Sequence, residues 1–362
     1  MQPAWQTQLP IARQMTCSTF LLRQPHAFLI GHNLDAPYSV LGVIVRNTRN
    51  IQKTSISFSE LLSAQKSLTR PLLWTSNYGS ITFNPMGCEF PDGGVNEVGL
   101  YVQEMTLPET RFPNNPHLPR MFMAQWIQYL LDTCQSVDAV LESLGHIALD
   151  GWEWHFFVAD KSGQYTAIEF VDGRTLSYTG TNMPIPVLCN ACYPDEIAKL
   201  AVYQGFGGQR SIQLHDIRFE RFVHAADLLR RAPTPATVAD GFTILEQLER
   251  GDTQWSHVID MDLGRIYFRS AQARQIKYLD VPQLDFSPAT PLQVIDIDIR
   301  DAGDMTKAFT DYSAERNWQV VKNIVETVDS DGGFTHMVEG HGETLSGFIQ
   351  RIAHYPITIG VL

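Results

Sequence analysis

Short apolar stretches separated by polar turns dominate the first hundred or so residues of the chain. CSTFLL, AFLIGHNLD and SVLGVIVRN, all within residues 17–50, predict three strands with tight turns at Gln24–Pro25 and Ala36–Pro37. WTSNYGSITFN at 74–84 is rich in β-branched and aromatic residues and predicts another strand. In PDGGVNEVGLYVQEM at 91–105, we expect a Gly-rich turn followed by a further strand.

Helical spacing of apolar residues first appears at residues 119–145, where Ser136 is a suitable N-cap for VDAVLESL. Later segments predict a β-meander over 152–180, helices over 216–231 and 237–250, a hairpin over 253–270 and a helix over 304–328. Residues 329–362 show no decisive pattern. We therefore expect groups of strands to alternate with groups of helices.

This order of elements favours an α+β fold over a doubly wound parallel sheet, which alternates single strands with single helices. Antiparallel sheets covered by layers of helices fit it better. The chain shows no repeat, low-complexity tract or linker. Residues 17–362 are therefore expected to form a single domain with a C-terminal helical tail at about 304–362.

Composition and charge narrow the functional classes. The 362 residues are 44% hydrophobic, which is enough for a sizeable core, and the net charge of −12 argues against a nucleic-acid binder. No segment has the length of apolar sequence that a membrane span needs. The first sixteen residues lack the basic and apolar regions of a signal peptide, so a cytoplasmic location is expected. Histidine spacings typical of metal sites and glycine motifs for nucleotides are absent, so neither metal nor cofactor is expected.

Five cysteines include a C-x-x-C pair, Cys189 and Cys192, without the second pair that a zinc site needs. Cys17 is different, because Asp35 follows it after what we predict to be one hairpin. A carboxylate there can orient an α-amine, which acts as base when Cys17 is the first residue of the mature chain. The spacing alone favours a plainer alternative, a buried structural cysteine beside a turn-capping aspartate.

CSTF followed by GHNLD resembles the opening of the linear amide carbon–nitrogen hydrolases, the choloylglycine hydrolase group with penicillin V acylases and bile salt hydrolases. Seven further segments resemble this family in the expected order, from Cys17 to about residue 320: WTSNYGSITFN, GGVNEVGL, HFFVADKSGQYTAIEF, PVLCN, RFVHAADLL, TQWSHVIDMDLGRIYFRS, and LDFSPATPLQV with FTDYSAERN. The resemblance implies an N-terminal-nucleophile hydrolase with a four-layer αββα sandwich.

The resemblance also implies roles for individual residues. Cys17 is the expected nucleophile, and Asp35 orients its α-amine. Asn190 and the backbone N–H of Thr106 form the expected oxyanion hole. Arg221 best fits the second catalytic arginine, although Arg218 opens another Arg-Phe pair and leaves the register open; the alternative for either arginine is a solvated helix face.

His32 departs from the family, which has an arginine beside the nucleophile. A histidine is only partly charged at pH 7 and lacks the five donors of a guanidinium. We therefore expect a weaker enzyme or a more acidic optimum, with His32 among the site residues. The rival hypothesis is a degenerate homologue that binds an N-acyl ligand without efficient turnover.

The mechanism requires a free α-amine on Cys17, so residues 1–16 are expected to form a leader that is removed, by self-cleavage after Thr16. Translation from Met15 is an alternative that still leaves Thr16 to remove. A second rival enzyme is a papain-like Cys/His hydrolase that needs no processing. The expected partner is a small N-acyl amide, whether bile salt, penicillin, acyl homoserine lactone or lipid. Its acyl group is expected to contact Thr106, Phe28, Leu34 and Tyr78. Homo-oligomerisation stays open.

Overall fold

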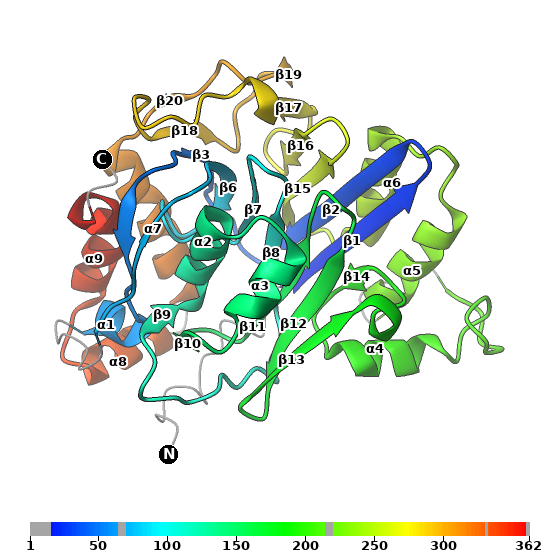
Figure 1. Cartoon of the computed structure of the whole chain (residues 1–362), viewed down its shortest axis with the longest axis horizontal. Helices are drawn as coiled ribbons and strands as arrows, with labels where there is room; N and C mark the ends of the chain where they lie inside the picture. The colour runs from blue at the N-terminus through cyan, green and yellow to red at the C-terminus, as the bar shows by residue number, and fades with distance from the viewer. Residues whose placement is uncertain (1–15, 64–69, 214–219, 330–331, 360–362) are drawn as a thin grey trace.

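The computed structural model describes residues 16–63, 70–213, 220–329 and 332–359. Two large sheets face each other, and helices cover the outer face of each sheet (Figure 1). The described chain thus has four layers in the order αββα. This confirms the α+β sandwich of two antiparallel sheets that the sequence predicts.

The first sheet has seven strands, and all neighbours except the last pair are antiparallel. In spatial order its strands are β14 (Val187–Leu188), β1 (Thr16–Gln24), β2 (Ala27–Asp35), β15 (Thr253–Asp260), β16 (Arg265–Ser270), β17 (Lys277–Asp280) and β19 (Gly303–Asp304). Strands β1 and β2 are buried along nearly their whole length, because one face meets the other sheet and the other face meets helices. This explains their continuous apolar runs.

The second sheet has nine strands, all antiparallel to their neighbours. In spatial order these are β13 (Arg174–Thr179), β12 (Tyr165–Val171), β11 (Trp154–Ala159), β8 (Tyr101–Thr106), β7 (Gly93–Asn96), β6 (Ser80–Asn84), β3 (Val43–Asn47), β18 (Gln293–Asp296) and β20 (Thr310–Asp311). Two small strand pairs lie outside it, β4 (Gln52–Thr54) with β5 (Leu73–Thr75), and β9 (Arg120–Phe122) with β10 (Ala148–Asp150).

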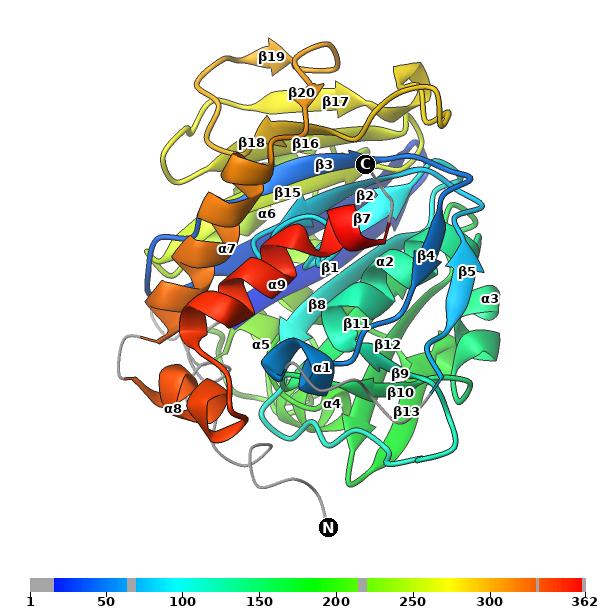
Figure 2. The same cartoon turned by 90° about the vertical axis from the view of Figure 1, so that its left-hand side faces the viewer.

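One helical layer consists of α4 (Tyr193–Leu200), α5 (Arg221–Arg231) and α6 (Val238–Leu248). Helix α5 packs against β1 and β14, and α6 against β2 and β15, so this layer covers the seven-stranded sheet. Helices α2 (Met123–Thr133), α7 (Ala314–Val328) and α9 (Leu345–Thr358) lie over the nine-stranded sheet (Figure 2). The remaining helices are short: α1 (Phe58–Leu62), α3 (Val137–Ser143) and α8 (Gly333–Gly340).

Side-chain caps fix the beginnings of several helices. Ser136 caps α3, as the sequence predicts, by accepting the backbone N–H of Ala139 at 3.2 Å. Thr237 caps α6 in a reciprocal capping box with Asp240. These caps satisfy N–H groups that have no partner within the helix.

Two expectations for local structure are wrong. Gly93–Asn96 is strand β7 and not a turn: a Cβ on Gly94 would lie only 2.4 Å from the carbonyl oxygen of Ile81, so close packing and not flexibility requires this glycine. The helix expected over 304–328 begins only at Ala314, because β19 and β20 occupy the segment before it. None of the helices in the described residues is long and apolar enough to cross a membrane.

Candidate active site

The β1–β2 hairpin positions Cys17 and Asp35. Cys17 pairs with Leu34, and Thr16 pairs with Asp35, at the open end of the hairpin. Because side chains alternate along a strand, Cys17 faces the space between the two sheets while Asp35 faces the helices. Both side chains are completely buried.

The Asp35 carboxylate is held by two donors from distant segments. Its Oδ1 accepts from the Thr253 hydroxyl at 2.5 Å, and its Oδ2 accepts from Arg221 Nη1 at 3.1 Å. Burial raises the pKa of Asp35 to about 6, although Arg221 and Thr253 oppose this change. The carboxylate is therefore the favoured form at neutral pH, and its proton is held more tightly than that of an exposed aspartate.

Arg221 is the centre of the hydrogen-bond network. It is the first residue of α5 and only 6% exposed, unlike the solvated arginine of a helix surface. Its Nη1 also donates to the Cys17 carbonyl oxygen at 3.0 Å and to the Ser18 hydroxyl at 3.1 Å. Its Nη2 donates to Asn190 Oδ1 at 2.5 Å. One guanidinium thus joins the two strands of the hairpin to the segment after β14.

Asn190 lies directly against the backbone of Cys17. Its Oδ1 accepts the backbone N–H of Cys17 at 2.8 Å, and its Nδ2 donates to the Thr106 carbonyl oxygen at 2.8 Å. The structure therefore brings Cys17, Asn190 and Thr106 together. The observed contact of Thr106 is made by its carbonyl group, whereas the expectation concerns its N–H.

His32 does not supply the charge expected of it. It is fully buried, and its Nδ1 shares a 2.9 Å hydrogen bond with the Thr19 hydroxyl. Burial, together with the nearby His257 ring, lowers the pKa of His32 well below its usual value, so the imidazole is neutral. Within the described residues no hydrogen bond joins His32 to Cys17. The sequence predicts a partly charged His32, whereas burial keeps it neutral.

The thiol of Cys17 is poorly ionised in this arrangement. Burial raises its pKa well above the usual value, and the carboxyl groups of Glu104 and Asp35 raise it further. Arg221 acts in the opposite direction but does not outweigh them. The thiol therefore needs a base within reach to become a nucleophile.

Several other sequence expectations have clear outcomes. Arg218 lies outside the described residues. Leu34 and Thr106 lie near Cys17, but Phe28 pairs with Arg23 at the far end of the hairpin. Tyr78 lies beside the end of α2, where its backbone N–H donates to the Asp132 carbonyl oxygen. Neither Phe28 nor Tyr78 therefore lines a pocket at Cys17.

The sequence analysis did not identify two residues of this hydrogen-bond network, Thr253 and Ser18. Thr253 is the first residue of TQWSHVIDMDLGRIYFRS, one of the segments that resemble the family. The motif therefore includes this residue, but it does not indicate that the hydroxyl binds Asp35. Ser18 follows Cys17 directly, and its hydroxyl points to Arg221 on the opposite side of the strand from the thiol. The Thr253 contact is revealed by the pairing of β15 with β2, and the Ser18 contact by the position of α5.

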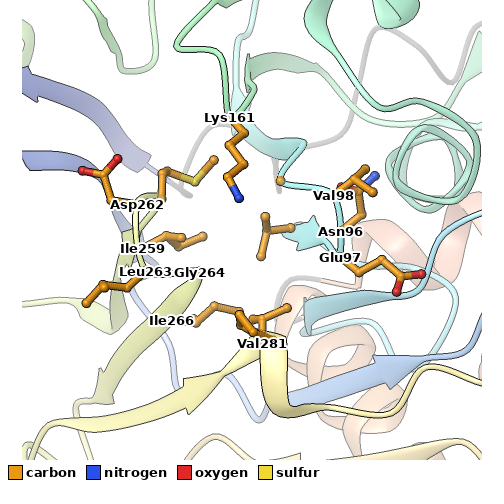
Figure 3. Close-up of a pocket in the computed structure, with 14 residues that line it drawn as sticks. Asn96, Glu97, Val98, Lys161, Ile259, Asp262, Leu263, Gly264, Ile266 and Val281 are labelled. Carbon is orange, nitrogen blue, oxygen red and sulfur yellow. The ribbon is translucent and has the colours of Figure 1, made fainter.

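A separate pocket opens at the other end of the sandwich, among the turns after β7, β11 and β15 (Figure 3). Its floor is apolar and includes Ile259 and Ile266, and the Lys161 side chain extends into it. Ile259 lies four residues along β15 from Trp255, which pairs with Leu34, so the pocket is at least about 13 Å from the level of Cys17. It shares no residue with the site above.

The four-layer αββα arrangement of the described chain is the fold of the N-terminal-nucleophile hydrolases. No family model matches the chain. The sequence is 23% identical to a penicillin V acylase of Pectobacterium atrosepticum over 263 residues, which span 60% of this chain and 70% of that protein.

Solved structures agree. Penicillin V acylase from Agrobacterium tumefaciens superposes with a TM-score of 0.70 at 20% identity, covering 82% of this chain and 98% of that one. A variant of conjugated bile acid hydrolase from Clostridium perfringens gives a TM-score of 0.63 at 16% identity, covering 77% and 97%. These comparisons confirm the predicted resemblance to the choloylglycine hydrolase family and its fold.

Proposed function

We propose that this protein hydrolyses a linear, non-peptide carbon–nitrogen amide bond, with Cys17 as the nucleophile once its α-amine is free. The observation that carries the proposal is the 2.8 Å hydrogen bond between the Cys17 nitrogen and Asn190 Oδ1. The nitrogen that is the α-amine of the mature chain thus already forms a hydrogen bond with Asn190, which in turn contacts the buried Arg221–Asp35 pair. The likeness to penicillin V acylases and bile acid hydrolases supports the same chemistry.

In the proposed acylation step, the α-amine takes the thiol proton, and the Cys17 sulfur attacks the amide carbonyl carbon. The carbon–nitrogen bond breaks, the α-amine delivers the proton to the leaving amine, and a thioester remains on Cys17. Water then attacks the thioester with the α-amine again as base. The acid leaves, and the sulfur regains its proton.

Asn190 and Thr106 are the proposed oxyanion donors. The Asn190 amide carries two hydrogens on Nδ2, and the Thr106 carbonyl takes one of them. The other is available to the oxygen that becomes negative in the transition state, together with the Thr106 N–H. Arg221 donates hydrogen bonds to the Asp35 carboxylate and to the Cys17 carbonyl oxygen. The side chains of Asp35 and Arg221 lie on the helical side of the strand, away from the thiol.

Maturation is part of the proposal, because the nitrogen of Cys17 is an amide as long as Thr16 precedes it. We propose that the Cys17 sulfur attacks the Thr16 carbonyl carbon, which moves the acyl group from nitrogen to sulfur and frees the α-amine. Water then cleaves this thioester and leaves Thr16 with a carboxyl group. Residues 1–16 depart, and the mature domain starts at Cys17.

The substrate class follows from the relatives only in outline. Penicillin V acylase and conjugated bile acid hydrolase, as their names state, act on a penicillin and on conjugated bile acids. N-acyl homoserine lactones and N-acyl lipids share the same acyl–nitrogen bond. We therefore propose an N-acyl small molecule, with an acyl group that lies between the sheets near Leu34.

The test is amine release from a panel of these four amide classes, combined with alkylation of Cys17. We expect one class to be hydrolysed, and we expect alkylation to stop the reaction. Cys17→Ala should be inactive, whereas Cys88→Ala, which alters another buried cysteine away from the network, should retain activity. Ligand binding without amine release, or an active Cys17→Ala, would contradict the proposal.

A further inference from the structure

The segment that carries Asn190 has little regular structure of its own. Strand β14 ends at Leu188 and α4 begins at Tyr193, so the backbone of Cys189–Cys192 lies outside the sheet ladder and the helix. Yet the Asn190 side chain must present one atom to Cys17 and another to Thr106. Something outside the segment has to fix its backbone, because an oxyanion donor works only at a defined distance.

His155 forms a hydrogen bond with the first residue of this segment, Cys189. Its Nε2 lies 2.8 Å from the Cys189 carbonyl oxygen, the residue immediately before Asn190. A carbonyl oxygen only accepts, so Nε2 carries the proton. The imidazole is completely buried on β11, and Trp154, the preceding residue of that strand, pairs with Thr106. The contact thus ties the Asn190 segment to β11, the strand that pairs with Thr106 of β8.

Glu169 holds the end of the segment. Its Oε1 accepts the backbone N–H of Tyr193 at 2.7 Å, a group at the beginning of α4 that has no partner within the helix. The same oxygen lies 3.4 Å from His155 Nδ1. The two side chains are therefore in direct contact with each other as well as with the segment.

The β11–β12 ladder explains why these two groups meet. Phe156 pairs with Ile168, so His155 and Glu169 occupy the next opposed positions on the same two strands. Both side chains are fully buried. The β11–β12 hairpin thus forms hydrogen bonds with both ends of the Asn190 segment, at Cys189 and at Tyr193. Arg221 of α5 contacts the Asn190 side chain itself.

We propose that His155 and Glu169 are positioning residues that set the Asn190 amide at its distance from Cys17 and Thr106. This inference rests on the proposed function, because it assigns a purpose to the position of Asn190. Neither residue touches the reacting atoms. Their effect is exerted through the backbone of Cys189–Tyr193.

The proposal predicts a specific kinetic signature. An oxyanion exists only in the transition state, so misplacing its donor lowers kcat and leaves KM little changed. A displacement of about 1 Å at a reacting centre typically costs about 10²-fold in rate. Glutamine at position 155 supplies an N–H donor similar to Nε2, whereas phenylalanine fills the space and donates nothing.

The experiment compares His155→Phe, His155→Gln and Glu169→Leu with the parent enzyme, each checked for folding by circular dichroism. We expect His155→Phe to lower kcat by about 10²-fold with KM unchanged, and His155→Gln to recover most of the loss. His257→Gln is the matched control, a second fully buried histidine whose ring bonds Tyr101 instead. Equal losses in the phenylalanine and glutamine variants, or a loss confined to KM, would overturn the proposal.

Hydrogen exchange gives a second readout that does not depend on activity. The Tyr193 N–H is protected by Glu169, so a peptide covering residues 189–193 should exchange faster in Glu169→Leu, which removes the acceptor, and in His155→Phe. A peptide from β15 and β16 should be unchanged. Unaltered exchange at 189–193 would overturn the positioning role even if the parent protein hydrolyses no amide, a result that would refute the proposed function separately.

Discussion

Two clusters of buried charge lie in different parts of the molecule. One joins Arg221 to Asp35 at 3.1 Å beside Cys17. The other places Lys53 Nζ 3.0 Å from Glu89 and 3.1 Å from Asp132, at the junction of β4 with α2. Both are almost completely shielded from solvent, and both connect segments that are far apart in the sequence.

The difference between them is what the remaining polar atoms contact. Asp132 also accepts from Trp74 Nε1 at 2.9 Å and from Gln128 Nε2 at 2.8 Å, so its side-chain partners are core residues and not a reactive group. Although burial lowers the pKa of Lys53, the two carboxylates outweigh it, and the net change is upward. Lys53 is therefore a fixed cation.

The Arg221 cluster instead directs its donors to a potential nucleophile. Arg221 binds the Cys17 carbonyl oxygen, and its partner Asn190 binds the Cys17 nitrogen. Buried charge alone is therefore no sign of a catalytic site, and its contact with a reactive group is the informative feature. Substitutions in the Lys53 cluster should affect stability, and substitutions around Arg221 should affect chemistry.

The largest effect on stability is expected for Lys53→Met. Removing the ammonium leaves two carboxylates buried without compensation, which costs about 3–5 kcal/mol in the free energy of unfolding. Urea unfolding followed by tryptophan fluorescence measures this loss, and the kcat of the molecules that remain folded should match the parent.

Lys322→Met serves as the control for this substitution. Lys322 forms an exposed pair with Glu326 on α7, and such pairs contribute at most about 1 kcal/mol. If the free energy of unfolding falls no further in Lys53→Met than in Lys322→Met, the Lys53 cluster does not stabilise the fold as we expect.

Asn190→Ala should have the opposite profile. Loss of one oxyanion donor lowers kcat by about 10²–10³-fold, while the free energy of unfolding should change far less than in Lys53→Met. Steady-state kinetics and urea unfolding on the same preparation separate the two effects. Asn323→Ala is the matched control, because Asn323 also accepts a backbone N–H, that of Leu41 at 2.8 Å, but lies on α7. Equal activity in both variants would remove Asn190 from the proposed mechanism.

The pH dependence follows from Asp35, whose pKa of about 6 is raised by burial. A carboxyl group with a raised pKa contributes most to stability below its unfolded pKa of 3.8, and this contribution declines as the pH rises through about 6. Activity should change in the opposite direction, because only the carboxylate accepts from an α-ammonium. We therefore expect kcat/KM to fall as the pH drops through about 6, because a protonated Asp35 no longer stabilises the α-ammonium that forms when the α-amine takes the thiol proton. Full activity well below this range would contradict the role of Asp35.

The smallest effect on activity in this series is expected for His32→Gln. Neutral His32 contributes one hydrogen bond to Thr19, and glutamine can retain it, so kcat should change by less than in Asn190→Ala. The acid limb of the pH–rate profile should stay in place, because Asp35 and not His32 sets it. A shift of that limb in His32→Gln would restore the charged role first inferred from the sequence.

Local patterns predicted much of the framework. The continuous apolar runs of β1 and β2 imply strands buried on both faces, and the single hairpin between Cys17 and Asp35 brings these two residues close together. Ser136 was identified as a cap because capping involves residues only three positions apart. Asn190 and Arg221 were found from motifs, which identify residue types without their contacts.

The sequence did not predict features that depend on distant segments. Gly94 is confined by the carbonyl of Ile81 on a neighbouring strand, and nothing in a Gly-Gly pair distinguishes this constraint from a turn. The neutral state of His32 arises from complete burial in the assembled sandwich. The salt bridges of Lys53 with Glu89 and Asp132 connect residues up to 79 positions apart and carry no local pattern. The bond between His155 and the Cys189 carbonyl oxygen joins residues 34 positions apart and likewise carries no local pattern.

The most direct test of the central claim is the intact mass of the purified chain together with its amidase activity. We predict that the active protein lacks residues 1–16 and begins at Cys17, and that Cys17→Ala keeps Thr16 and the residues before it. Fully active protein that retains Thr16 on Cys17 would contradict the account, because its nucleophile would then have no α-amine to act as base.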